Sequence, residues 1–156
     1  MAARPESSRT MMIRRADARD VAAIKACVRA SLNATYGGLW TSEPIEVGDD
    51  DWAKSWIACS SDGIDGVGLS ERDVVSDLWV HPDAQGGGIG SALLAALEGE
   101  IAARGFIVAR LRCLEANQKS RVFYAARGWT EVRVYPHEVI PLNTVDLEKS
   151  LTVFGG

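Results

Sequence analysis

Apolar residues follow two different periodicities along the chain, and the changes between them mark the predicted elements. Three stretches with helical spacing, each bounded by capping or stop residues, predict helices at residues 17–36, 89–104 and 117–127. Short apolar runs separated by turn-rich sequence predict strands at residues 11–15, 55–59, 66–69, 74–80, 106–114, 129–135 and 144–149. This order combines hairpins with one strand–helix–strand crossover. It predicts an α/β layered domain around one mixed sheet rather than a doubly wound nucleotide-binding fold.

Length and composition indicate one globular domain. The 156 residues fit a domain over residues 11–156, preceded by a disordered extension over residues 1–10. Hydrophobic residues make up 47% and charged residues 24%, and the net charge is −4 without a long run of one sign, so no nucleic-acid partner is expected. The chain has neither an apolar stretch long enough to span a bilayer nor the apolar core of a signal peptide, so we expect a cytoplasmic protein that does not enter a membrane.

The three cysteines, Cys27, Cys59 and Cys113, are far apart and odd in number. They form no CxxC pair and no Cys/His zinc spacing, so we expect free thiols and no bound metal. A nucleophilic Cys113 would need a histidine partner, and the chain contains only His81 and His137.

A glycine-rich loop between a strand and a helix is the most informative part of the sequence. The predicted strand ends at Leu78-Trp79-Val80, and after five intervening residues Gly86-Gly87-Gly88-Ile89-Gly90-Ser91 opens the helix. Glycines permit positive φ angles and a close approach of the backbone to a ligand. The first-turn N–H groups of a helix lack intrahelical partners and lie at the positive end of its dipole. The loop therefore predicts a phosphate-binding site.

Three families of phosphate-binding loop compete for this segment. A Walker P-loop requires Lys followed by Ser or Thr, and Ile89-Gly90-Ser91 stands there instead. A dinucleotide-binding loop requires the strand to run directly into GxGxxG, but residues 81–85 intervene and Ser91 occupies the third glycine position. The third pattern, Gln-x-x-Gly-x-Gly, is satisfied by Gln85, Gly88 and Gly90. A plain connecting loop, in which the glycines only ease a tight turn, remains the alternative.

The segment resembles the acyl-CoA-binding motif of the GNAT superfamily of N-acetyltransferases, including the preceding Leu-Trp-Val-His-Pro. A second resemblance follows at the expected distance, in Asn117, Val122-Phe123-Tyr124 and Gly128-Trp129. Phe123 and Trp129 are expected to pack in the core, and Asn117 to cap a helix. The resemblance implies a single-domain fold with a mixed, mostly antiparallel sheet, helices on both faces and splayed central parallel strands.

The resemblance also assigns roles to individual residues. It implies backbone contacts to pantetheine from Leu78, Trp79 and Val80, contact from Asn117, and protonation of the departing CoA thiolate by Tyr124. The pyrophosphate-binding residues would be Gln85, Gly86, Gly87, Gly88, Ile89, Gly90 and Ser91. Asp77 is the candidate general base. Strand alternation places it on the face opposite Leu78 and Val80, from which a bulge would re-aim it, and a solvated strand carboxylate is the alternative. An ordered water is the alternative to a protein base, and Glu115, His137 and Glu138 are weaker candidates.

The implied function is transfer of an acetyl group from acetyl-CoA to a primary amine of a small molecule or a protein, by direct attack in a ternary complex. The alternative is a GNAT-like sensor that binds acyl-CoA without turnover. Two residues depart from the family pattern: Gly87 stands where a basic residue is usual, and Arg112 where enzymes that acetylate ribosomal-protein N-termini tend to carry an acidic base. The acceptor is undetermined, and Trp40, Trp52 and Trp56 are candidates to line its pocket or to pack in the core. Because the family is often dimeric, a homodimer is a further expectation.

Overall fold

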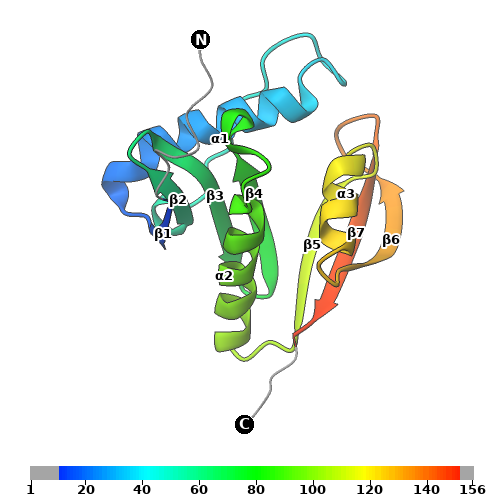
Figure 1. Cartoon of the computed structure of the whole chain (residues 1–156). Coiled ribbons are helices and arrows are strands. Elements are labelled where there is room, and N and C mark those ends of the chain that lie inside the picture. The colour runs from blue at the N-terminus through cyan, green and yellow to red at the C-terminus, as the bar shows by residue number, and fades with distance from the viewer. Residues whose placement is uncertain (1–10, 152–156) are drawn as a thin grey trace. The chain divides into compact units, whose positions relative to one another are not determined.

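The computed structural model describes residues 11–151, in which helices are interspersed between single strands and runs of consecutive strands (Figure 1). The strands are β1 (Met12–Arg15), β2 (Trp56–Ser60), β3 (Gly63–Glu71), β4 (Val74–Val80), β5 (Val108–Leu114), β6 (Thr130–Pro136) and β7 (Asn143–Ser150). The helices are α1 (Val21–Tyr36), α2 (Ile89–Ala103) and α3 (Gln118–Ala125), with short 3-10 turns at Ala18–Asp20, Trp52–Lys54 and Pro82–Ala84. The extension predicted for residues 1–10 lies outside the described residues.

The strands form one seven-stranded sheet in the order β1-β2-β3-β4-β5-β7-β6. The pairs β1–β2, β2–β3, β5–β7 and β6–β7 are antiparallel, whereas β4 and β5 are parallel, with Val74 opposite Arg110. The predicted fold class, an α/β fold with a mixed and mostly antiparallel sheet, is therefore confirmed.

The chain divides into two compact units. Within the described residues, the N-terminal unit comprises the chain up to Leu69 together with Asp77–Leu97, and the C-terminal unit comprises Ser70–Ser76 together with the chain from Glu98 onwards. Strands β3 and β4 and helix α2 each contribute residues to both units. The glycine loop and Asp77 belong to the N-terminal unit, whereas Asn117 and Tyr124 belong to the C-terminal unit.

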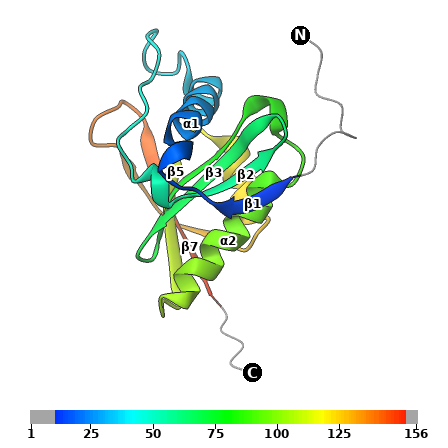
Figure 2. The same cartoon turned by 90° about the vertical axis from the view of Figure 1, so that its left-hand side faces the viewer.

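Strand alternation divides the core of the N-terminal unit between α1 and the start of α2. Ile57 of β2 packs in the same cluster as Ile24 of α1, whereas its neighbour Ala58 packs with Ile89 and Leu93 of α2. Strands β1 to β3 accordingly run between the two helices in Figure 2. Helices therefore cover both faces of the sheet in this unit, as predicted.

Two glycines of β3 allow α2 to approach the sheet closely. A Cβ atom at Gly66 would lie 2.7 Å from Cγ2 of Ile89, and one at Gly68 would lie 2.9 Å from Cδ1 of Leu97. Such distances are shorter than real Cβ contacts, so larger residues would push the helix away from β3. These glycines help to set the position of α2, and with it the position of the loop that precedes the helix.

The core of the C-terminal unit combines the inner faces of β5 and β7 with α3 and the end of α2. Its buried residues include Ile101, Ala109, Leu111, Tyr124, Trp129, Val145 and Leu147. Glu98 of α2 accepts hydrogen bonds from Trp129 Nε1 at 3.1 Å and from Lys149 Nζ at 2.7 Å. This carboxylate therefore links α2, the segment after α3, and β7.

Most predicted elements agree with the structure, and the differences have local causes. Asp17, predicted as a helix cap, caps the 3-10 turn that leads into α1, where its Oδ1 accepts from Arg19 N at 2.8 Å. Strand β3 is longer than the predicted 66–69, because its pairing with β2 continues to Gly63 at the hairpin turn. Asn117 caps α3 as predicted, with its Oδ1 accepting from Ser120 N at 3.1 Å.

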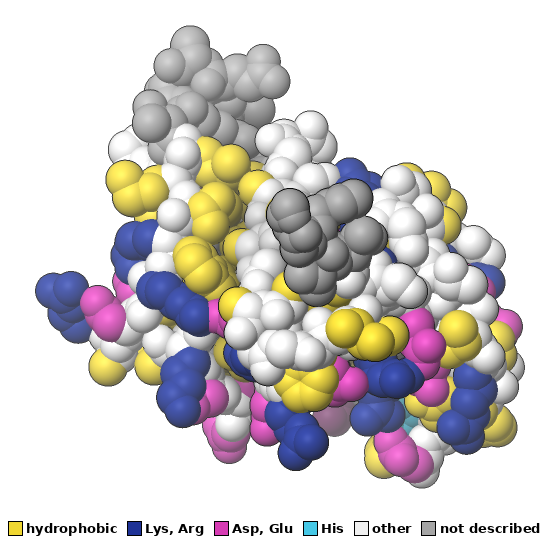
Figure 3. Space-filling view, turned by 90° about the horizontal axis from the view of Figure 1, so that it is seen from below, with side chains coloured by type: hydrophobic (Ala, Val, Ile, Leu, Met, Phe, Trp, Pro, Cys, Tyr) yellow, Lys and Arg dark blue, Asp and Glu magenta, His cyan; other side chains and the backbone are white. Residues whose placement is uncertain are grey.

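Opposite charges are paired at many places on the described surface. Examples are Arg14 with Asp20 at 2.9 Å and Arg121 with Glu131 at 2.8 Å. Acidic and basic side chains are interspersed on the face drawn in Figure 3, so neither sign gathers into one large patch there. None of the helices described for residues 11–151 combines the length and hydrophobicity needed to cross a bilayer.

Candidate active site

The glycine loop has the backbone conformation that its sequence predicts. Gly86 and Gly88 have φ angles of +86° and +81°, in the region that L side chains rarely adopt. Both are exposed, and a Cβ atom at either would meet no heavy atom within 4 Å. Their conformation rather than crowding therefore explains the glycines. The exposed loop leads directly into the first turn of α2, where backbone N–H groups are available to an anion.

Hydrogen bonds attach the segment before the loop to the end of β4 and to β3. Gln85 Nε2 donates to the carbonyl of Val80 at 3.4 Å, and His81 N donates to the carbonyl of Asp65 at 2.8 Å. His81 Nδ1 accepts from Asp83 N at 3.1 Å, so this histidine caps the turn before the loop. The structure therefore assigns His81 a local structural role.

The predicted alternation along β4 is confirmed. Leu78 and Val80 pack with the α2 cluster, whereas Trp79 packs with the α1 cluster. Asp77 lies on the Trp79 side, where its Oδ1 accepts from Trp79 Nε1 at 3.0 Å. The structure thus brings Asp77, the three proposed pantetheine-binding residues and the glycine loop together in one unit.

Asp77 is held in an environment that disfavours its charge. Burial, and to a lesser extent the neighbouring Asp50 carboxyl, raise the pKa of Asp77 to about 8, while the hydrogen bond from Trp79 opposes the shift. Its Oδ2 is buried, and no side chain within residues 11–151 donates a hydrogen bond to it. A carboxyl of this kind can accept a proton near neutral pH, as a general base must.

An aromatic cluster lies on the same side of β4 as Asp77. The Tyr36 ring centroid is 5.8 Å from that of Trp40 and 6.4 Å from that of Trp79. Of the three tryptophans proposed for the acceptor pocket, Trp40 joins this cluster, Trp52 is buried in the core, and Trp56 lies under the Arg15 guanidinium at 4.5 Å. Sequence reasoning missed Tyr36 and Asp50. The only signal for Tyr36 is its position four residues before Trp40 in the sequence.

In the C-terminal unit, Tyr124 is fixed by both its backbone and its ring. Its carbonyl accepts from Trp129 N at 3.1 Å, and its ring centroid lies 5.2 Å from Phe123 and 6.0 Å from Trp129. Trp129 is a core residue, as predicted. Phe123 is only half-buried, and the Arg127 guanidinium stacks over its ring, 3.8 Å from the centroid. Its contacts are therefore not limited to the core.

The weaker base candidates and Cys113 have structural roles or unfavourable surroundings. Glu115 Oε1 accepts from Asn143 at 3.1 Å, His137 Nδ1 accepts from Val139 N at 3.0 Å, and Glu138 lies 3.6 Å from Arg112. Burial raises the pKa of the Cys113 thiol to about 11, which disfavours the nucleophilic thiolate. Within residues 11–151, none of the three cysteines takes part in a disulfide.

Comparison with known proteins identifies the family. Residues 51–131, more than half of the chain, match the acetyltransferase (GNAT) domain. The chain therefore belongs to the GNAT acetyltransferase family. Among functionally curated sequences no match was found.

Solved structures of this family have the same fold. A GCN5-related N-acetyltransferase from Rhodopseudomonas palustris is 24% identical, with a TM-score of 0.75 over 91% of this chain and 96% of that one. YncA from Salmonella typhimurium, whose structure was solved with its cofactor acetyl-CoA, is 22% identical, with a TM-score of 0.71 over 94% and 97% of the two chains. The PaiA N-acetyltransferase from Thermoplasma acidophilum, solved with coenzyme A, is 18% identical, with a TM-score of 0.71 over 90% and 99%.

Proposed function

We propose that this protein transfers an acetyl group from acetyl-CoA to a primary amine of a small molecule or a protein. The observation that carries the proposal is the exposed loop of positive-φ glycines, which joins the strand of Asp77 to the first turn of α2. The structures of YncA with acetyl-CoA and of PaiA with coenzyme A support the choice of cofactor. The high pKa of Asp77 favours an enzyme over a sensor that only binds acyl-CoA.

In the proposed reaction, both substrates are bound at once and the amine attacks the thioester directly. Ionised Asp77 takes a proton from the ammonium group, and the neutral nitrogen then attacks the thioester carbonyl carbon. A backbone N–H of β4 polarises the carbonyl oxygen, which becomes an oxyanion as the C–N bond forms. The intermediate collapses with cleavage of the C–S bond, and Tyr124 gives its proton to the departing thiolate. Solvent then restores the proton to Tyr124 and accepts the proton from Asp77.

The proton transfers are matched to the pKa values of these groups. Asp77, with a pKa of about 8, is close to an α-ammonium group of pKa ~8 and well below a lysine ammonium of pKa ~10.4. A phenol of pKa ~10 is protonated at neutral pH and can supply a proton to a thiolate of pKa ~8.5. Without a basic side chain at Gly87, binding of the pyrophosphate rests on the backbone N–H groups of the loop and the first turn of α2.

Acetyl-CoA is expected to stabilise the protein selectively. At a concentration ~100 times its Kd, a ligand stabilises the folded state by ~2.7 kcal/mol, which for a chain of this size raises Tm by roughly 5–10 °C. Thermal denaturation should show such a shift with acetyl-CoA and a much smaller one with NAD or ATP. Equal stabilisation by all three would contradict the cofactor assignment.

Asp77→Asn is expected to stabilise the protein at pH 8 while impairing acetyl transfer. Because the folded-state pKa of Asp77 is raised, the folded protein holds a proton that the unfolded chain loses between pH ~4 and ~8. The free energy of unfolding of the wild type should therefore fall as pH rises through this window. Asn, which resembles the protonated acid, should remove that slope and gain on the order of 1–3 kcal/mol at pH 8.

The measurements are urea denaturation at pH 4 and pH 8, and kcat/KM as a function of pH. Wild-type activity should rise up to a pH of about 8, and the variant should lose that rise. Glu71→Gln removes an exposed carboxylate at the end of β3 and should leave both profiles unchanged. If Asp77→Asn keeps the wild-type pH profile of activity, Asp77 is not the base.

A further inference from the structure

The aromatic cluster of Tyr36, Trp40 and Trp79 lies beside Asp77, and all four residues belong to the N-terminal unit. The ring of Tyr36 meets that of Trp79 edge-on, at 83° between the planes, and that of Trp40 at a tilt of 43°. The three aromatic residues are half-buried, so part of each remains accessible. Such rings attract a further aromatic ring through edge or offset contacts, beyond the effect of buried area.

Trp79 connects this cluster to the proposed reaction centre. Its Nε1 donates to Asp77 Oδ1 at 3.0 Å, and in the chain it stands between Leu78 and Val80, two of the proposed pantetheine-binding residues. Asp77 Oδ2 is buried, and no group within residues 11–151 forms a hydrogen bond with it. A buried acceptor without a donor is costly, so a bound ammonium group would complete this carboxyl.

A loop segment, residues 43–51, is held along α1 in the same unit. Asn33 of α1 donates from Nδ2 to the carbonyl of Ile45 at 3.1 Å, and its Oδ1 accepts from Ile45 N at 2.8 Å. Val47 packs against the α1 cluster, against which Trp79 also packs. The segment therefore lies close to the side of β4 that carries the aromatic cluster.

This segment is strongly acidic. Five of its nine residues are Asp or Glu, and none is Lys or Arg. Two of the acids pair with lysines outside the segment, Asp49 with Lys25 at 3.6 Å and Asp51 with Lys54 at 3.2 Å, so an excess of negative charge remains. The exposed Asp50 carboxyl contributes to the raised pKa of Asp77. The field near Asp77 therefore attracts an ammonium group and repels a carboxylate.

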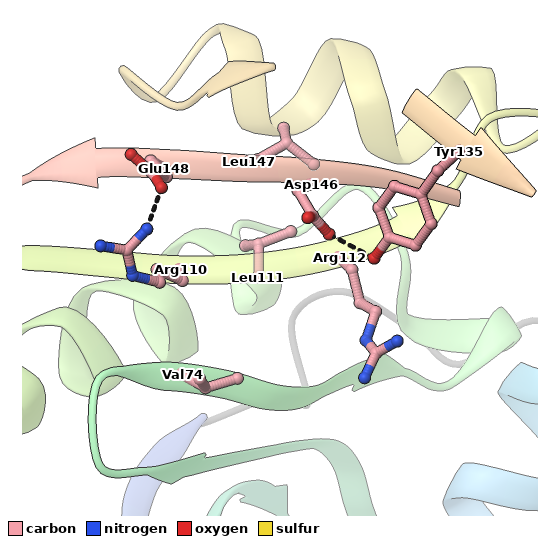
Figure 4. A pocket seen from close by; sticks show the side chains of 8 residues that line it. All are labelled: Val74, Arg110, Leu111, Arg112, Tyr135, Asp146, Leu147 and Glu148. Atoms are coloured by element: carbon pink, nitrogen blue, oxygen red, sulfur yellow. Dashed lines mark hydrogen bonds and ion pairs between the residues drawn. The ribbon is translucent and has the colours of Figure 1, made fainter. Parts of the chain in front are cut away.

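The polar pocket on β5 and β7 of the C-terminal unit, with a volume of about 280 Å³, differs in this respect (Figure 4). Two carboxylates line it, and both have partners that also line the pocket. Glu148 pairs with Arg110, and Asp146 accepts from the Tyr135 hydroxyl at 2.7 Å. Neither is left to bind a cation, in contrast to Asp77 Oδ2.

We propose that Tyr36, Trp40 and Trp79 bind the amine acceptor, and that the acceptor is an aralkylamine without a carboxylate. This inference rests on the proposed acetyl transfer. The ammonium group of the acceptor lies toward Asp77, and its aromatic ring packs against the cluster. The rings supply affinity for an aromatic group, and the acidic segment discriminates against acids, so one surface combines attraction with exclusion.

The aromatic preference is tested by comparing 2-phenylethylamine with 2-cyclohexylethylamine and ethylamine in a thiol-release assay. In the wild type, kcat/KM should be highest for 2-phenylethylamine, about 2–10-fold above the cyclohexyl compound and at least ~10-fold above ethylamine, mainly through KM. Trp40→Leu and Tyr36→Leu should each bring the phenyl-to-cyclohexyl ratio toward one. Trp40→Phe should keep part of the preference, because it retains an aromatic ring.

Trp56→Leu is the matched control. Trp56 is a half-buried tryptophan of the same unit, but it lies under the Arg15 guanidinium and packs with the α2 cluster. This variant should keep the wild-type preference. Because the ratio of kcat/KM for two amines does not depend on the fraction of folded enzyme, partial unfolding of a variant cannot imitate the expected loss.

The exclusion of acids is tested with phenylalanine and phenylalaninol, in which a neutral hydroxymethyl group replaces the carboxylate. The wild type should favour phenylalaninol by ~10-fold or more in kcat/KM at low ionic strength, because a like charge is disfavoured near the acidic segment. High salt should narrow this ratio, since it screens exposed charges. Equal kcat/KM for the two compounds at low salt would contradict the proposal.

Two further results would overturn the proposal and leave acetyl transfer intact. One is a phenyl-to-cyclohexyl ratio near one in the wild type, or a preference that survives in both leucine variants. The other is a higher kcat/KM for 1,4-diaminobutane than for 2-phenylethylamine, which would assign the surface to a dication. Calorimetry separates failure of the proposed function: binding of 2-phenylethylamine that is lost in Trp40→Leu but kept in Trp56→Leu, in a protein that acetylates none of the amines, would support the aromatic site and count against acetyl transfer.

Discussion

Gly88→Glu is expected to abolish acetyl-CoA binding while leaving the protein folded. Gly88 has a φ angle of +81°, so any L side chain at this position strains the backbone, typically by ~1–3 kcal/mol. Glutamate also places a negative charge where the proposed site accepts a pyrophosphate. Because Gly88 is exposed and a Cβ atom there would meet nothing within 4 Å, the core is not disturbed. Calorimetric titration should show at least ~100-fold weaker binding of acetyl-CoA, as expected when a close backbone contact and a favourable field are both lost.

Gly38→Glu provides a closely matched control for this experiment. Gly38 is also exposed, has a φ angle of +80°, and has no heavy atom within 4 Å of an ideal Cβ. The control therefore introduces the same strain and charge at the end of α1, outside the proposed phosphate site. Acetyl-CoA affinity should stay close to that of the wild type. If Gly88→Glu also binds acetyl-CoA normally, the glycine loop is only a connector.

Much of this fold was predictable because local signals and packing requirements agree. The Asn117 cap, the Gly128 stop and the apolar spacing from Ile89 to Ile101 each mark a helix that the structure contains. The glycine loop was predictable for the same reason, since few other residues tolerate the φ angles of Gly86 and Gly88.

The surroundings of individual side chains were less predictable, because they depend on residues far away in the sequence. The raised pKa of Asp77 requires burial on the α1 side of β4 and the nearby carboxyl of Asp50, which belongs to an irregular loop. The aromatic cluster likewise forms only because the end of α1 meets Trp79 of β4. The local sequence predicts neither the raised pKa of Asp77 nor the aromatic cluster. Judged from that sequence alone, Asp77 also fits a solvated strand carboxylate.

The difference between Arg110 and Arg112 also depended on tertiary structure. Alternation along β5 predicts that Arg110 and Arg112 share a face, but it gives no reason to treat them differently. The structure separates them, because Arg110 is held by Asp73 and Glu148, whereas Arg112 has a distant and exposed partner in Glu138. The strength of the ion pairs therefore differs between two arginines that the local sequence does not distinguish.

Tyr124 is the residue that best separates an enzyme from a sensor. Only 8% of this residue is exposed, and its ring packs against the rings of Phe123 and Trp129, which restrict its orientation. Its proposed role is to donate a proton in the transition state, with little contribution to binding of the ground state. Removing such an interaction lowers kcat and kcat/KM together.

Tyr124→Phe is therefore expected to reduce kcat by about 10²–10⁴-fold, the usual contribution of a positioned proton donor. The variant keeps the ring and its contacts with Phe123 and Trp129, so Tm should change little. Steady-state kinetics on any amine that the wild type acetylates, with acetyl-CoA affinity measured separately by calorimetry, distinguishes the outcomes. Nearly full turnover would make Tyr124 a packing residue, with water or another group protonating the thiolate. A parallel loss of turnover and acetyl-CoA affinity would instead assign the hydroxyl to cofactor binding, because a group that acts only in the transition state leaves the affinity for the ground state unchanged.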